Sequence, residues 1–165
     1  MITQKKKSSM NLFLYQYVNK VDKKGRVSLP STFRNVLTKE NKNEIILFKS
    51  LKFPSIEGCS TERINKIASR IDKLDIFSDD QDDFTTSIFS EIIPTILDKE
   101  GRFLIPEKLK KYSNINSEVT FIGQGYYFQI WEPKAAIDRQ KKSRERLIKE
   151  KKTLGSIIVS NSDVR

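Results

Sequence analysis

The chain has 165 residues, of which 31 are Lys or Arg and 21 are Asp or Glu, so its formal net charge at pH 7 is +10. Hydrophobic residues make up 37% of it, with six Gly and five Pro, which excludes a disordered chain, a collagen-like repeat and a membrane protein. The absence of histidine excludes Ser-His and Cys-His catalytic pairs and histidine metal sites, and the positive charge favours a polyanionic partner, nucleic acid before an anionic membrane surface.

Cys59 is the only cysteine, so the chain can form neither a thiolate zinc site nor an intrachain disulfide. We expect its thiol to be buried and unreactive, in a reducing compartment. No signal peptide or transmembrane helix is predicted, because Gln16 and Asn19 interrupt the apolar run from Leu12 to Tyr15. The sequence therefore predicts a cytoplasmic protein that is not an enzyme. It predicts no metal or cofactor, no binding to a membrane and no small-molecule substrate.

The first half of the chain is predicted to form a half-domain over residues 12–77, after a basic N-terminal extension over residues 1–11. Pro30 suits the first turn of a helix, because that position needs no N–H donor. The expected elements are, in chain order, a strand over 13–21, a tight turn, a strand over 27–29, a helix over 31–37, a strand over 44–48 and a helix over 61–74.

The second half is predicted to repeat this order over residues 89–147, after an acidic linker over 78–88. Four carboxylates within six residues of the linker repel one another and cannot be buried together, and their spacing lacks the Gly and terminal Glu of a calcium loop. A basic, flexible tail is expected over 148–165. The expected elements are strands over 89–97, 103–105, 118–122 and 126–131, and helices over 107–112 and from Pro133 onward.

The two halves are an internal duplication. Shifting the chain by 76 positions superposes residues 21–34 on residues 97–110, so that Asp, Lys, Gly, Arg and Pro coincide and Arg34 matches Lys110. The period is longer than that of a solenoid repeat and occurs only twice. The sequence therefore predicts two copies of one half-domain, related by a pseudo-twofold axis.

The turn from Asp22 to Arg26 is the most informative motif. Asp22 can accept bonds from backbone N–H groups two residues on, and Gly25 supplies the positive φ that a tight turn requires. One interpretation is a local Asp22–Arg26 ion pair that contributes only turn geometry. The other is a rigid turn that holds Arg26, Lys23 and Lys24 outward, toward phosphates or the acceptor edge of guanine.

The second turn has the same frame, in which Asp98 and Gly101 orient Arg102 and Lys99 as further candidate DNA contacts. Glu100 stands where the first turn has a lysine, so this turn is less electropositive. Because the motif occurs twice at equal positions in a basic chain, the sequence favours nucleic-acid binding.

These motifs resemble the MraZ family of bacterial transcriptional regulators, over roughly residues 10–147. The doubled Asp-x-x-x-Arg motif is specific, although residues 10–15 lack the glycine common near the family's start. The stretches that carry the resemblance are Tyr17-x-x-x-Val21-Asp22-x-Lys24-Gly25-Arg26-Val27-x-Leu29-Pro30-x-x-Phe33-Arg34, its second copy at Asp98 to Pro106, and Val119 to Gly125 leading into Phe128-x-Ile130-Trp131-x-Pro133.

The resemblance implies a mainly β fold with short helices (α+β), in which two tandem swapped-hairpin half-domains of the AbrB type fuse into one pseudo-twofold barrel. It further implies a ring-shaped homo-oligomer, associated with the nucleoid, that binds tandem direct repeats of double-stranded DNA in its own promoter region. There it would regulate the division and cell-wall gene cluster.

Residue by residue, the resemblance assigns DNA contact to Arg26 and orientation of that arginine to Asp22, with Arg102 and Asp98 as the second-copy equivalents. Two alternatives stay open from the sequence. One is an AbrB-like antitoxin or interaction protein, and the other is an RNA-binding chaperone that uses the same basic surface.

Overall fold

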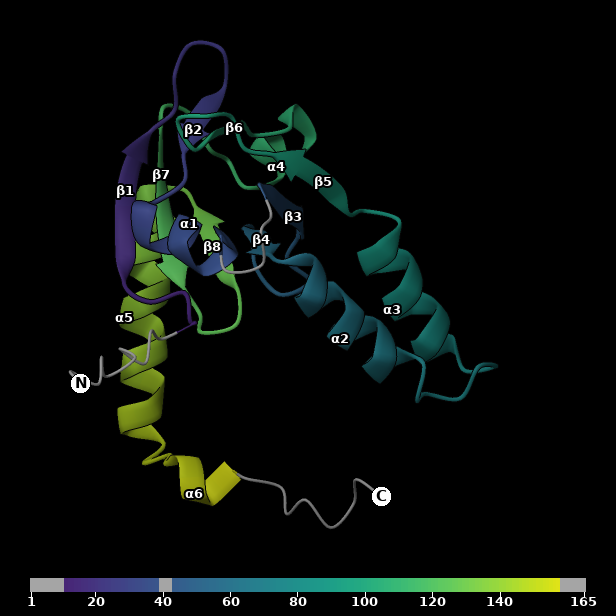
Figure 1. Cartoon of the computed structure of the whole chain (residues 1–165). Coiled ribbons are helices and arrows are strands. Elements are labelled where there is room, and N and C mark those ends of the chain that lie inside the picture. The colour runs from purple at the N-terminus through teal and green to yellow at the C-terminus, as the bar shows by residue number, and fades with distance from the viewer. Residues whose placement is uncertain (1–10, 39–42, 158–165) are drawn as a thin grey trace, which may run out of the picture. The chain divides into compact units, whose positions relative to one another are not determined.

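The computed structural model describes residues 11–38 and 43–157, and the predicted basic extension lies almost wholly outside them (Figure 1). The strands are β1 (Gln16–Lys20), β2 (Arg26–Ser28), β3 (Glu44–Lys49), β4 (Ile56–Cys59), β5 (Ile93–Ile96), β6 (Arg102–Leu104), β7 (Glu118–Gly123) and β8 (Phe128–Trp131). The helices are α1 (Ser31–Thr38), α2 (Thr61–Ile71), α3 (Asp79–Phe89), α4 (Glu107–Tyr112), α5 (Pro133–Lys149) and α6 (Leu154–Ile157).

Six strands form one sheet in the order β1-β7-β8-β4-β3-β5. The two halves exchange their first strands, because β1 pairs with β7 of the second copy and β5 pairs with β3 of the first copy. The centre of the sheet is the β4–β8 pair, in which Glu57 lies opposite Gln129. This exchange confirms the predicted α+β class and the swapped arrangement of the two copies.

The two remaining strands, β2 and β6, form a separate antiparallel ribbon, seen at the top of Figure 1. Val27 lies opposite Phe103, and these residues are 76 positions apart, the period of the duplication. Backbone bonds from Leu29 to Gly101 (2.9 Å) and from Ile105 to Gly25 (3.0 Å) repeat the same symmetry. The ribbon and the β4–β8 pair therefore both lie on the predicted pseudo-twofold axis.

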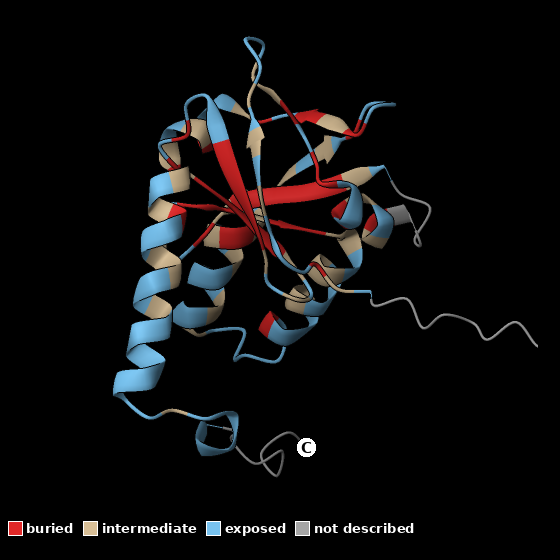
Figure 2. Ribbon diagram, turned by 90° about the vertical axis from the view of Figure 1, so that its left-hand side faces the viewer, coloured by how far each residue is buried: buried red, intermediate tan, exposed pale blue. Residues whose placement is uncertain are grey.

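The core lies between the ribbon, α1, α4 and one face of the sheet, and both copies contribute to it. Its aromatic centre is Phe33 of α1, whose ring lies 5.3 Å from that of Phe128 and 6.2 Å from that of Phe121, between ring centroids. Figure 2 shows the buried residues concentrated along the strands. A second cluster, on the opposite face of β3, joins Ile46 and Phe48 to α2 and α3.

The predicted barrel is not closed. β1 and β5 remain the two edges of the sheet, because each leads through its turn into the ribbon instead of pairing with the other edge. The predicted strand, tight turn and strand around Asp22 do form, but β1 and β2 belong to different sheets and do not pair with each other. Helices on the far face of β3 bury its apolar side chains there, so the sheet need not curl on itself to bury them.

The acidic segment predicted as a linker forms α3. Ser78 caps this helix by accepting a bond from the backbone N–H of Gln81 (3.2 Å), and three aspartates follow in the first turn. Carboxylates at a helix N-terminus are favourable because they face the positive end of the helix dipole. The aspartates therefore favour the start of a helix at this position, and they also keep the segment exposed.

The chain divides into two compact units, one ending at Pro133 and the other beginning at Lys134. The second unit contains nearly all of α5 and the short α6, and α6 falls within the residues predicted as a flexible tail. Within the described ranges, no helix is long and apolar enough to cross a membrane.

Candidate nucleic-acid interface

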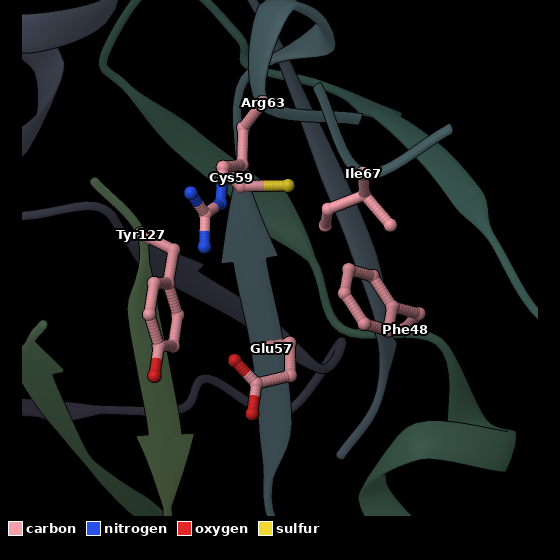
Figure 3. A pocket seen from close by; sticks show the side chains of 6 residues that line it. All are labelled: Phe48, Glu57, Cys59, Arg63, Ile67 and Tyr127. Carbon is pink, nitrogen blue, oxygen red and sulfur yellow. The ribbon is translucent and has the colours of Figure 1, made fainter. Parts of the chain in front are cut away.

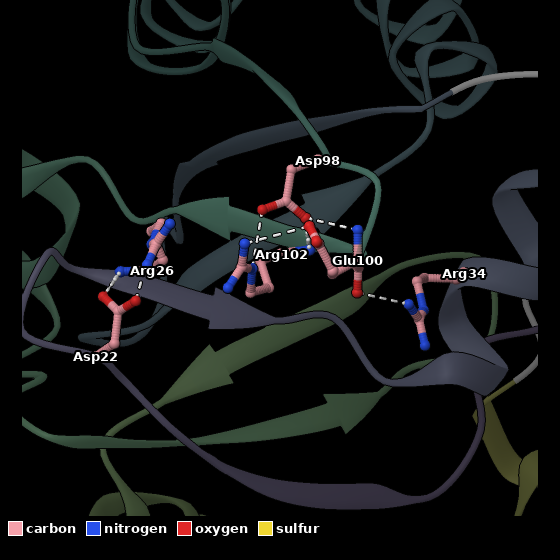
Figure 4. A network of polar contacts seen from close by, with 6 residues as sticks. All are labelled: Asp22, Arg26, Arg34, Asp98, Glu100 and Arg102. Carbon is pink, nitrogen blue, oxygen red and sulfur yellow. Dashed lines mark hydrogen bonds and ion pairs between the residues drawn. The ribbon is translucent and has the colours of Figure 1, made fainter.

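The first turn is built by local bonds to one carboxylate. Asp22 Oδ1 accepts bonds from the backbone N–H of Lys24 and of Arg26, both at 2.9 Å, and Asp22 Oδ2 accepts the Nε–H of Arg26 at 2.8 Å. Gly25 has a φ of +83°, as the sequence predicted. Asp22 therefore holds the Arg26 guanidinium through its Nε–H, and within the described residues neither terminal nitrogen of Arg26 has a hydrogen bond of its own (Figure 4).

The second turn repeats this geometry. Asp98 accepts the backbone N–H of Glu100 at 3.0 Å and that of Arg102 at 2.9 Å, and its other oxygen accepts Arg102 Nε–H at 2.9 Å. Glu100 adds a contact with no counterpart in the first turn, since its carboxylate binds Arg102 Nη2 at 3.2 Å. One terminal nitrogen of Arg102 is therefore already bonded, whereas in the part of the chain that the structure describes neither terminal nitrogen of Arg26 is.

Pairing of β2 with β6 brings the two turns onto one surface. Val27 and Phe103 point into the core, so the neighbouring residues of both strands face outward. Arg26 lies opposite Leu104, and Ser28 lies opposite Arg102. The hydrogen bond that Arg102 donates to the Asp98 carboxylate raises the pKa of Arg102, and the more distant Asp22 carboxylate contributes to the same shift.

We call this outward face of β2 and β6, with its two turns, the ribbon face. It brings together every residue singled out from the sequence: Arg26, Lys23, Lys24, Arg102 and Lys99 as candidate contacts, and Asp22, Gly25, Asp98 and Gly101 as the residues that orient them. The three lysines are exposed, and the two arginine side chains are each 35% exposed. Both interpretations of the turn from the sequence therefore apply here: each arginine forms an ion pair with its own aspartate, and the basic side chains face outward.

Sequence reasoning missed the role of Arg34. Its Nη1 donates a hydrogen bond to the carbonyl of Glu100 at 2.9 Å, across 66 positions of sequence (Figure 4). The available signal was the match between Arg34 and Lys110 in the duplication, but that match does not reveal which turn the arginine reaches.

As the pH is lowered, we expect the unchanged protein to lose stability more steeply than the double variant Asp22→Asn, Asp98→Asn. Backbone N–H groups of Arg26 and Arg102 lower the pKa of Asp22 and Asp98, respectively. A carboxyl whose folded pKa is depressed contributes stability above its unfolded pKa of about 3.9, and this contribution is lost as pH falls through the folded value. Melting temperatures measured by circular dichroism between pH 6 and pH 2.5 test this, and equal slopes for both proteins would contradict it.

Four titratable side chains line a small pocket on the sheet, away from the ribbon face. A cavity of about 120 Å³ is lined by Phe48, Glu57, Cys59, Arg63, Ile67 and Tyr127 (Figure 3). Cys59 is buried, as the sequence predicted, and burial raises the pKa of its thiol to about 12, which favours the protonated form at neutral pH. Burial also raises the pKa of Glu57, whose carboxylate accepts a bond from the Gln129 amide at 3.0 Å.

The Glu57 and Arg63 side chains of this pocket have structural partners. The Glu57 carboxylate is bound by the symmetric partner strand at the centre of the sheet, where it joins the two copies. Among the described residues, no group of three or more Cys, Asp or Glu side chains is placed to hold a metal ion. We therefore regard the ribbon face, and not the pocket, as the candidate site.

Comparison with known proteins agrees with the family resemblance of the sequence. The family model described as "MraZ protein, putative antitoxin-like" matches residues 88–154. A protein of Pelagibacter ubique (strain HTCC1062) named transcriptional regulator MraZ is 46% identical over 124 residues, which are 75% of this chain and 80% of that protein.

Two further relatives carry the same name. The protein of Rickettsia akari (strain Hartford) is 38% identical over 143 residues, covering 87% of this chain and 95% of the relative. That of Rickettsia rickettsii (strain Sheila Smith) is 43% identical over 124 residues, covering 75% and 83%. With its swapped halves, its paired Asp-x-x-x-Arg turns and this similarity along most of its length, the chain belongs to the MraZ family of transcriptional regulators.

Proposed function

We propose that this protein is a sequence-specific regulator that binds double-stranded DNA with its ribbon face. The observation that carries the proposal is the pairing of β2 with β6, which presents Arg26 and Arg102 on one outward surface, each held by an aspartate of its own turn. A two-stranded ribbon fits the major groove of B-DNA, where sequence is read from base edges.

The residues of the ribbon face divide into two roles in this proposal. Arg26 is the main reader of bases, because both terminal nitrogens remain for a bidentate contact with O6 and N7 of guanine. Arg102 contributes less, since Glu100 occupies its Nη2. The exposed ammonium groups of Lys23, Lys24 and Lys99 contact phosphates and set the register without reading sequence.

The proposed binding site is a set of tandem direct repeats in the protein's own promoter region, read by a ring-shaped homo-oligomer in the cytoplasm, at the nucleoid. The regulated genes are those of the division and cell-wall cluster. The printed names of the relatives support regulation of transcription, and the small size of the ribbon face supports an assembly, because so few charges neutralise too few phosphates for tight binding.

The experiment that tests this function is a gel-shift titration with the duplex upstream of the chain's own gene. We expect the protein to retard the labelled upstream duplex in the gel. An unlabelled scrambled duplex of equal length should not compete for the protein. Preferential binding of single-stranded RNA would favour the RNA chaperone instead. Binding only in complex with the product of a neighbouring gene would favour the antitoxin class, which the description of the family model also names.

A further inference from the structure

The two turns of the ribbon face are not held in the same way, although their sequences are repeats. Arg34 of α1 in the first copy reaches the second turn, where its Nη1 donates to the Glu100 carbonyl at 2.9 Å. The symmetric residue in α4 is Lys110, and its Nζ lies 3.9 Å from the Glu107 carboxylate of its own helix. Helix α1 of the first copy therefore contacts the turn of the second copy, whereas the matching side chain of α4 contacts its own helix.

Gly101 is the second observation that points to this contact. Its φ of +74° alone favours glycine, but the space beside it is also taken, since a Cβ there would overlap the guanidinium and Cδ of Arg34. At Gly25 in the first turn, the nearest atom to such a Cβ among the described residues is Leu104 Cδ1 at 3.3 Å, an apolar atom in place of a guanidinium. The guanidinium of Arg34 thus fills the place that a side chain at the second turn would occupy.

The contact lies directly beside the functional arginine. Glu100, whose carbonyl accepts the bond from Arg34, also holds Arg102 Nη2 with its carboxylate and donates its backbone N–H to Asp98. One residue therefore links Arg34 to both partners of Arg102. A shift of the Glu100 backbone would move the two carboxylates that orient the Arg102 guanidinium.

We propose that Arg34 is a positioning residue that holds the second turn in place and so aims Arg102 at DNA, while the first turn carries Arg26 without such a restraint. This inference rests on the proposed DNA-binding function. It makes the two pseudo-symmetric turns functionally different. Both share the backbone bonds of the ribbon with the opposite copy, but only the second turn is also held by a side chain of that copy.

The test is a double-variant cycle of Arg34→Ala and Arg102→Ala, measured as affinity for the duplex of the chain's own upstream region. Loss of one hydrogen bond corresponds to about fivefold weaker binding for Arg34→Ala. In the Arg102→Ala background the same change is expected to have no further effect. If Arg34 contacted phosphate directly, the two losses would multiply, and that result would overturn the proposal.

Three further measurements separate positioning from a general loss of stability. Lys110→Ala, the matched change at the symmetric position, should leave affinity unchanged, and Arg34→Lys, which retains a charged donor, should recover most of the affinity. Hydrogen exchange should rise over residues 98–104 in Arg34→Ala and stay the same over residues 22–28. An equal rise in both segments, or in neither, would overturn the proposal.

The exchange measurement does not depend on DNA. If the protein bound no DNA but Arg34→Ala still freed residues 98–104 alone, the positioning contact would stand and the proposed function would fail. If the protein bound its upstream duplex and Arg34→Ala changed neither exchange nor affinity, the function would stand and the positioning role would fail.

Discussion

A duplex with four tandem repeats is expected to bind this protein about 10²–10⁴ times more tightly than a duplex with one repeat. Each ribbon face offers two arginines and three lysines, and one such element neutralises few phosphates at physiological salt. Under the proposed function, affinity therefore comes from several copies bound to the same DNA.

The proposed ring-shaped assembly also predicts the form of the repeats. In a cyclic oligomer the ribbon faces of neighbouring copies point the same way around the ring, so they match direct repeats and not the palindromes read by twofold dimers. A spacing of roughly 10–10.5 bp keeps all repeats on one face of the duplex. Linked binding then raises the overall affinity without any new contact between protein and DNA.

Fluorescence anisotropy with duplexes of one, two and four repeats measures this effect. The control is a four-repeat duplex with about 5 bp inserted between the second and third repeats, a half turn that moves them to opposite faces of the helix. We expect this insertion to reduce binding to the level of two repeats. Equal affinities for one and four repeats, or indifference to the insertion, would contradict multiple phased contacts.

The variant Arg26→Ala is expected to abolish specific binding while the fold persists. The side chain is partly exposed, and its hydrogen bond and ion pair among the described residues are with Asp22 of its own turn, so its removal leaves the core intact. Loss of a bidentate contact with guanine costs about 1–3 kcal/mol at each copy, and the loss is multiplied across an assembly. Affinity for the upstream duplex and the circular dichroism spectrum are measured together.

Two variants serve as controls for Arg26→Ala. Arg102→Ala should weaken binding less, because Glu100 already occupies one terminal nitrogen of that guanidinium. Arg70→Ala removes the same charge from an exposed position on α2 and should change affinity less than either. Unchanged affinity in Arg26→Ala would refute the assignment, and loss of the folded spectrum would assign Arg26 to the structure of the turn.

Light scattering shows whether Arg102 serves assembly instead of DNA. A smaller particle for Arg102→Ala, with the fold retained, would assign this residue to contact between copies. An equal loss of affinity in Arg26→Ala and Arg102→Ala would contradict the asymmetry that the Glu100 contact predicts.

The sequence by itself determined the local geometry of the two turns. Asp22 and Asp98 each bind N–H groups two and four residues further on, and the positive φ of Gly25 and Gly101 follows from residue type. These bonds span at most four residues, so the residue order is enough to specify them. The duplication in turn predicted that both turns stand in the same structural setting.

Only the tertiary structure decided which strands pair. The alternation of apolar residues before and after each turn is equally consistent with a local β1–β2 hairpin and with the observed exchange between copies. Burial resolves this choice, because pairing β2 with β6 places Val27 and Phe103 together in a core to which both halves contribute. The open sheet has the same origin, since its edge strands lead into the ribbon.

The contact of Arg34 with the second turn was also beyond the reach of the sequence. Repeated sequences predict repeated local structure, but Arg34 and Lys110 have different partners once the chain is folded. A side chain reaches a carbonyl 66 positions away only after the two copies have packed against each other. Bonds between neighbours in sequence are thus encoded by residue type, whereas contacts between distant segments depend on how the whole core is buried.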